Sequence, residues 1–215
     1  MRPCPFADAV TAIVEVEPPS WSGAAHARNL ASAALRMTYQ LRGHGAHHVG
    51  RSGAMLLVTQ CEGMLAGAVL HAMAPRPLHV LANEAMASTL PDAVLAKAGD
   101  IPVSLPTAVH AQRSALAALM DERVVVVAGS AVPVGYLVAM SGVPVMPVVL
   151  RGADGRVPTD PPRPRSRIDV YFAPAVSVSV PGDPLRASTR AVVTEQVRQL
   201  VSDAEDLAAR RAGHP

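Results

Sequence analysis

The chain has 215 residues, which is the length of one ordinary domain with a sizeable hydrophobic core. Half of its residues are hydrophobic but only 3% are aromatic, so the core must be built from alanine, valine, leucine and methionine. Acidic and basic residues nearly balance, giving a net charge of +2, which does not indicate a nucleic-acid partner. The sequence also lacks a basic stripe with interleaved aromatic residues. The two cysteines, Cys4 and Cys61, can form neither a disulfide framework nor a metal quartet.

The N-terminal segment does not have the pattern of a secretory signal. Residues 1–17 contain acidic residues and prolines where a signal would have a basic start and an apolar run. We therefore expect a cytoplasmic protein. We divide the chain into a partly flexible N-terminal extension, residues 1–23, and one folded domain, residues 24–211.

The first half of the chain alternates between helical and strand patterns. Apolar residues recur at helical spacing after residue 24, with the polar breaks of an amphipathic surface helix. Pro91 and Gly99 bracket another helix, because proline favours the first helical turn and glycine the residue after the last. The predicted elements are, in order, helix Ala24–Tyr39, strand Met55–Thr59, helix Leu65–Met73, strand Leu78–Ala82, helix Pro91–Gly99 and strand Ile101–Val103.

The second half contains an uncharged stretch, Val124–Leu150, that is long enough to span a membrane as one helix. Glycines and prolines interrupt it, whereas a lipid-exposed span needs its backbone hydrogen-bonded internally throughout. Fully buried parallel strands are continuous apolar runs, so strand–helix–strand explains the stretch better. The predicted elements are helix Thr107–Met120, strand Val124–Ala128, helix Val134–Ser141, strand Val145–Leu150, strand Ile168–Phe172 and helix Ser188–Arg211.

This alternation predicts the fold class. Strands and helices that follow one another along the chain favour an α/β domain with helices on both faces of the sheet. We expect a single layered domain with a mixed, mostly parallel sheet flanked by helices. Its central strands should be Met55–Thr59, Val124–Ala128 and Val145–Leu150.

One apolar run carries a family resemblance. The segment Gly142–Gly152 places Pro144 and Pro147 three residues apart among β-branched residues and closes with Leu-Arg-Gly. Prolines are unusual inside strands because they cannot donate to a ladder. The pattern resembles the last conserved block of the PlsC-like family of lysophospholipid and glycerol-3-phosphate acyltransferases. The blocks upstream follow the order of that family, and the resemblance covers roughly residues 39–174.

The resemblance identifies the positions of the family's catalytic dyad. In these acyltransferases a strand ends in a histidine, and an aspartate follows after four intervening residues, so that the carboxylate orients the imidazole as a base. Strand Met55–Thr59 aligns well, but the histidine position is Cys61 and the aspartate position is Ala66. Both members of the dyad are therefore replaced, and the resemblance implies a degenerate catalytic motif.

The resemblance also implies that the anion-binding residues are lost. The family's second block ends with a basic residue that holds the glycerol phosphate, and this position is Leu105. The third block supplies a glutamate and an arginine, whereas residues 128–131, including Ser130, provide neither. An anionic headgroup would therefore meet no guanidinium at these positions.

The leading hypothesis is a non-catalytic homologue that binds an acyl chain, a lipid or a partner protein. Its apolar groove would lie at the carboxyl edge of the sheet, as ligand sites in α/β folds do. The implied ligands are an acyl chain, acyl-CoA or acyl carrier protein, with at most peripheral contact to the inner face of the membrane. No cofactor and no metal is implied. The expected ligand-binding residues are Cys61, Leu70, Met73, Leu105 and Ser130.

The alternative hypothesis is an active acyltransferase with relocated chemistry. Cys61 would act as the nucleophile, because the start of a helix can lower a thiol pKa, or Glu62 would act as the base. The acceptor would lack a phosphate. The two hypotheses differ on whether a histidine or carboxylate lies within hydrogen-bonding reach of Cys61, and His79 would lie near it if the two strands were neighbours.

Three further groups have simpler interpretations. We expect His44, His47 and His48 to be solvated residues of a turn before the first strand, since no other metal ligand joins them. Arg163, Arg165 and Arg167 form part of a solvated loop, with contact to an acidic carrier protein or anionic lipid as the alternative. Trp21 packs against the core or anchors the first helix at a bilayer surface.

Overall fold

A seven-stranded sheet organises the chain, which is described by a computed structural model over residues 18–82, 91–103, 108–129 and 134–212. The spatial order is β1-β7-β6-β2-β5-β3-β4, and every neighbouring pair is parallel except the antiparallel pair β6–β7. The strands are β1 (Gln40–His44), β2 (Met55–Thr59), β3 (His79–Ala82), β4 (Ile101–Pro102), β5 (Val124–Ala128), β6 (Val145–Arg151) and β7 (Arg167–Phe172).

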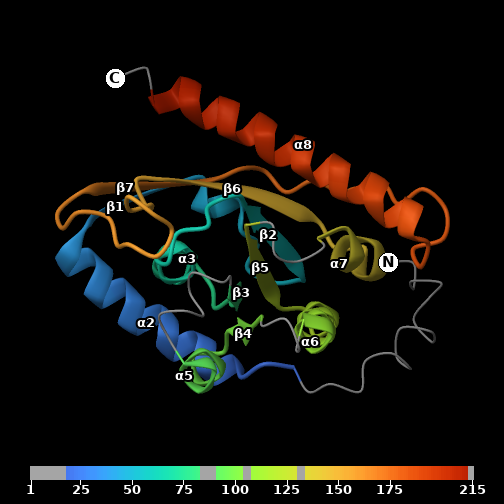
Figure 1. Ribbon diagram of the computed structural model, residues 1–215, viewed down its shortest axis with the longest axis horizontal. Helices are drawn as coiled ribbons and strands as arrows, with labels where there is room; N and C mark the ends of the chain where they lie inside the picture. Colours follow the sequence, from blue (N-terminus) through green and yellow to red (C-terminus); the bar gives the residue numbers. More distant parts are fainter. Residues whose placement is uncertain (1–17, 83–90, 104–107, 130–133, 213–215) are drawn as a thin grey trace.

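Helices cover both faces of this sheet (Figure 1). The core on one face joins α2 and α3 to the strands, and the core on the other joins α6, α7 and α8. All residues of β2 and β5 are buried, as expected for strands covered on both sides. The helices are α2 (Trp21–Thr38), α3 (Ala66–Met73), α5 (Asp92–Lys97), α6 (Ala108–Met120), α7 (Val134–Ser141) and α8 (Ala187–Ala212), with a 3₁₀ turn η1 over Ala46–His48.

The predicted single α/β domain with a mixed, mostly parallel sheet is confirmed. The uncharged stretch from residue 124 forms strand β5, helix α7 and strand β6. The strand–helix–strand prediction for this stretch is therefore confirmed. Within the described ranges, none of the helices combines the length and the apolar character needed to cross a membrane.

Pro147 marks the place where β6 changes partner. Residues 145–147 of β6 pair with β2, and residues 148–151 pair with β7. Proline has no N–H to donate, so the ladder to β2 ends there without leaving a donor unpaired. Its carbonyl still accepts a hydrogen bond from the N–H of Ala173 at 3.0 Å. Pro147 thus lies where β6 changes from a parallel to an antiparallel neighbour.

The first strand of the sheet was not predicted. The sequence analysis placed His44 in a turn, whereas Gln40–His44 form the edge strand β1 beside β7. The segment is mostly exposed and lacks an apolar face, so its strand conformation depends on pairing with a distant partner. Helix α2 also begins before Ala24, at Trp21, because the side chain of Ser20 accepts a hydrogen bond from the N–H of Gly23 at 3.1 Å and caps the helix.

Candidate active site

Cys61 follows strand β2 at the carboxyl edge of the sheet, and its thiol is bonded to a carboxylate. The side chain is half-buried, and Sγ donates to Oδ1 of Asp154 at 3.2 Å. Burial raises the pKa of the thiol to about 12, although a backbone hydrogen bond from Gly63 lowers it, and the neighbouring charges of Asp154 and Glu62 raise it further. The thiol therefore stays protonated at neutral pH, which is the opposite of an activated nucleophile.

Ala66, the residue that the resemblance aligns with the family's aspartate, is the first residue of α3. Its side chain is fully buried in the core and carries no proton to exchange. The position that would hold a catalytic carboxylate therefore contributes only packing.

His79 does not approach Cys61. Strand β5 lies between β2 and β3 in the sheet, and β3 runs parallel to β5. His79 is the first residue of β3, so it lies at the amino edge, whereas Cys61 lies at the carboxyl edge. The condition under which these two residues would meet, adjacent strands, is therefore not fulfilled.

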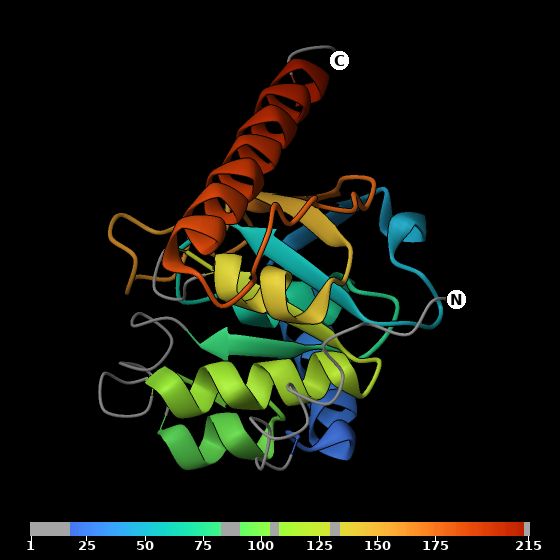
Figure 2. The ribbon, with the colours of Figure 1, turned by 90° about the vertical axis from the view of Figure 1, so that its right-hand side faces the viewer.

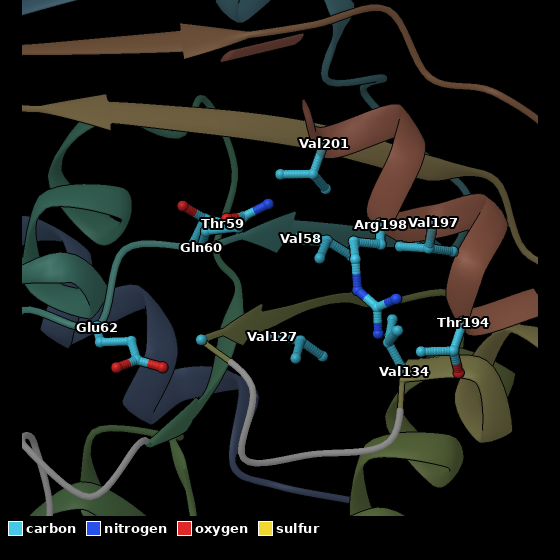
Figure 3. A pocket seen from close by; sticks show the side chains of 11 residues that line it. Val58, Thr59, Gln60, Glu62, Val127, Val134, Thr194, Val197, Arg198 and Val201 are labelled. Carbon is cyan, nitrogen blue, oxygen red and sulfur yellow. The ribbon is translucent and has the colours of Figure 1, made fainter. Parts of the chain in front are cut away.

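A cavity of about 280 Å³ opens beside this position, on the face of the sheet covered by α7 and α8. Figure 3 shows the valine side chains of the strands and of α8 around it, with Arg198 reaching down between them from α8. Five valines make up the apolar part of the lining, and most of the other lining residues are polar or charged. The lining residues are Val58, Thr59, Gln60, Glu62, Val127, Gly129, Val134, Thr194, Val197, Arg198 and Val201.

Two residues that come after strand ends line the cavity, Glu62 and Gly129. Glu62 follows directly after Cys61, and Gly129 follows directly after β5. Gly129 has φ of +72°, and a Cβ at this residue would lie 2.8 Å from Cγ of Glu62. Glycine therefore supplies both the left-handed turn and the space for the glutamate.

The other expected ligand-binding residues lie elsewhere or outside the described ranges. Leu70 is fully buried in the core on the α3 face, opposite the cavity. Met73 is partly buried near β1, with Cε 2.6 Å from the position of a Cβ on Gly43. Leu105 and Ser130 fall outside the described residues. None of the expected ligand-binding residues in the described ranges lines the cavity, although Cys61 lies in the chain between two residues that do, Gln60 and Glu62.

Asp154 was not identified from the sequence, because nothing in its surroundings distinguishes it from a solvated loop residue. It lines a second hollow of about 530 Å³ in the loop between β6 and β7, together with Arg163. The three arginines of this loop have different surroundings. Arg165 has φ of +64°, and Arg167 donates to both carboxylate oxygens of Asp169, at 2.6 and 2.9 Å. Arg163 is thus the member of the trio that faces a hollow.

Two of the three histidines, His44 and His48, contact β7. His44 Nε2 bonds to Oδ1 of Asp169 at 3.1 Å, and its ring stacks on Tyr171 with centroids 4.4 Å apart. His48 donates to the carbonyl oxygen of Phe172 at 2.9 Å. The described part of the chain contains no group of three or more residues able to hold a metal ion. The contacts of His44 with Asp169 and Tyr171 join edge strand β1 to its neighbour β7.

A second histidine–aspartate pair exists but is inaccessible. His71 Nε2 lies 2.8 Å from Oδ1 of Asp100, and both side chains are buried. The same oxygen accepts the backbone N–H of Val80 at 3.1 Å. The carboxylate therefore connects α3 to β3, and this pair has a structural role.

Comparison with known proteins supports the fold. No protein-family model and no curated protein matches the sequence. Among solved structures, the chain is similar to the 1-acyl-sn-glycerophosphate (LPA) acyltransferase PlsC from Thermotoga maritima, with a TM-score of 0.57 and 15% identity over 82% of this chain and 79% of that one. At this identity the likeness concerns architecture, and it agrees with the fold that the sequence resemblance implied. The chain therefore has an acyltransferase-like α/β fold.

Proposed function

We propose that the protein is a non-catalytic relative of the PlsC-like acyltransferases that binds an acyl chain in the cavity under α8. The observation that carries the proposal is the set of five valines around the cavity at the carboxyl ends of β2 and β5. Ligands of open α/β sheets bind at this edge, and small-molecule sites combine apolar walls with a few polar groups.

The size of the cavity favours a single chain. A volume of about 280 Å³ lies just below the usual range for ligand pockets, roughly 300–1,000 Å³. If a methylene group takes about the volume of a water molecule, roughly 30 Å³, the cavity has room for about nine of them. This volume corresponds to a single acyl chain of medium length.

The absence of catalysis is supported by the two dyad positions. A thiol with a pKa of about 12 and an alanine cannot provide the general base that the family's histidine and aspartate provide. A positioned base typically contributes about 10²–10⁴-fold to the rate. Ligand-binding roles for Cys61, Leu70, Met73, Leu105 and Ser130, and delivery of the chain by acyl-CoA or acyl carrier protein, stay predictions.

The alternative is an active acyltransferase that uses Glu62 as the base or Cys61 as the nucleophile, on an acceptor without a phosphate. Two observations favour it: Glu62 lines the cavity, and a carboxylate lies within hydrogen-bonding reach of Cys61. A carboxylate is too weak a base to remove the proton of a thiol with a pKa of about 12, so Asp154 would not activate Cys61. We prefer the non-catalytic function for this reason. An acyl thioester on Cys61 that is lost in Cys61→Ser would establish the alternative.

Native mass spectrometry of protein purified from its own host tests the proposal. We expect a co-purifying acyl species on the parent chain and its loss in Val197→Phe, because the larger ring would fill the cavity from α8. The matched control is Val192→Phe on the same helix, where the side chain is 46% exposed and does not line the cavity. Retention of the ligand by Val197→Phe, with both variants folded, would contradict the proposal.

A further inference from the structure

Arg198 places a cation at the wall of the apolar cavity. It lies on α8 one residue after Val197, and its side chain extends into the space between the valines of β2, β5 and α7 (Figure 3). The cavity is therefore amphipathic, with a guanidinium beside its apolar walls.

Most of the hydrogen-bonding capacity of Arg198 is unused. Nη1 donates to Oε2 of Glu195, one turn earlier on α8. The other N–H groups of Arg198 have no hydrogen-bond partner among the described residues. Guanidinium carries five N–H donors in a planar fork that matches a carboxylate.

The ion pair with Glu195 does not compete strongly with a ligand. The side chains of Arg198 and Glu195 are 62% and 64% exposed. Exposed pairs of this kind contribute little stability because water and salt screen them. A ligand carboxylate beside the valines would be better shielded, so its hydrogen bonds to Arg198 would be stronger.

We infer that the ligand is a free medium-chain carboxylate, with its carboxylate on Arg198 and its chain among the five valines. This inference rests on the proposed function and specifies the class of ligand. The cavity volume gives a chain of about eight carbons, since roughly nine groups of about 30 Å³ fill it.

The test compares octanoate with 1-octanol, which has the same chain and no charge, by isothermal titration calorimetry at neutral pH. We expect octanoate to bind more tightly than 1-octanol. Arg198→Gln should weaken octanoate about ten-fold or more, the effect of removing a charged hydrogen-bond partner, and should leave 1-octanol unchanged. The control is Arg190→Gln on the same helix, because Arg190 lies over the ring of Tyr136 at 6.0 Å and not at the cavity.

The outcomes separate the two proposals. Equal binding of octanoate and 1-octanol, with no effect of Arg198→Gln, would overturn the carboxylate inference and leave the acyl-chain function standing. If neither compound binds and no acyl species accompanies the protein from its host, both fall. Unchanged thermal unfolding of Arg198→Gln would confirm that its effect is on the site, as expected for an exposed side chain.

Discussion

Acidification should destabilise the protein through His79. The ring is fully buried, and Nδ1 donates to the carbonyl oxygen of Gly99 at 2.6 Å, while Nε2 has no hydrogen-bond partner among the described residues. Burial lowers the pKa of His79 below its ordinary value of 6.5, with Arg123 and His71 lowering it further against the opposing effects of Gly99 and Asp100. The folded protein therefore holds this histidine neutral.

The sign of the pH effect follows from proton binding. Above the ordinary pKa both the folded and the unfolded states are neutral at this residue, so stability does not depend on it. As the pH falls below 6.5, His79 becomes protonated in the unfolded chain while it stays neutral in the folded chain. The free energy of unfolding therefore decreases. The loss is up to about 1.4 kcal/mol per pH unit, so up to about 2 kcal/mol at pH 5, until the lowered pKa of the folded state is reached.

Urea unfolding between pH 5 and 7.5 measures this loss. Trp21, the sole tryptophan of the chain, provides the signal, because its ring lies 6.0 Å from that of His79. His79→Asn retains a donor for Gly99 but cannot titrate, so its stability should depend less on pH by up to about 2 kcal/mol over this range. His110→Asn, at an exposed position of α6, is the control. An equal pH dependence in the parent and His79→Asn would refute the reasoning.

Three further predictions concern the site and its supporting helices. Introducing the family's dyad with Cys61→His and Ala66→Asp should not produce acyl transfer to lysophosphatidate in an assay of acyl-CoA consumption, because Leu105 would still stand where the resemblance places the phosphate-binding basic residue. Gly135→Ala should lower the free energy of unfolding by about 1–3 kcal/mol in a urea titration, since its Cβ would meet the backbone of α8 and Oγ1 of Thr194. At pH 8, iodoacetamide should alkylate Cys61 roughly 10³-fold more slowly than an ordinary thiol of pKa about 8.5, because so little thiolate is present.

Each of these predictions has a result that would contradict it. Turnover of lysophosphatidate at an ordinary enzymatic rate, by the parent or the double variant, would show that the site can hold the acceptor. An unchanged free energy of unfolding in Gly135→Ala would mean that α7 and α8 do not pack closely at this residue. Rapid alkylation of Cys61 in a Cys4→Ser background would contradict the raised pKa and strengthen the alternative function.

The central sheet could be predicted because its strands are defined by their own sequence. Val124–Ala128 and Met55–Thr59 are continuous apolar runs between turn residues, and the structure gives these same bounds. Edge strand β1 could not be predicted, because its five residues have no apolar face and acquire their conformation from β7, more than a hundred residues later. Local pattern identifies buried strands, whereas exposed strands depend on distant pairing.

The site was predicted less completely than the fold. The position of Cys61 at the carboxyl edge followed from the end of a strand, but its partner Asp154 lies 93 residues away in a loop without a distinctive pattern. The expectation for Leu70 depended on the side of the sheet on which the groove would form. Alternate residues of a strand face opposite sides, and the described cavity lies on the side of Val58 and Val127.

The position of α8 has a thermodynamic consequence. Figure 2 shows this helix extending beyond the rest of the molecule at its C-terminal end, while its other end lies beside α7. Thr194, Val197, Arg198 and Val201 give the cavity one of its walls, so a ligand can occupy the complete site only when α8 is docked. Any ligand must therefore favour the docked state by RT ln(1 + [L]/Kd), about 2.7 kcal/mol at a hundred times Kd. Amide hydrogen exchange along the first half of α8 should then slow in proportion to occupancy, which would make this helix a reporter of whatever molecule the protein carries.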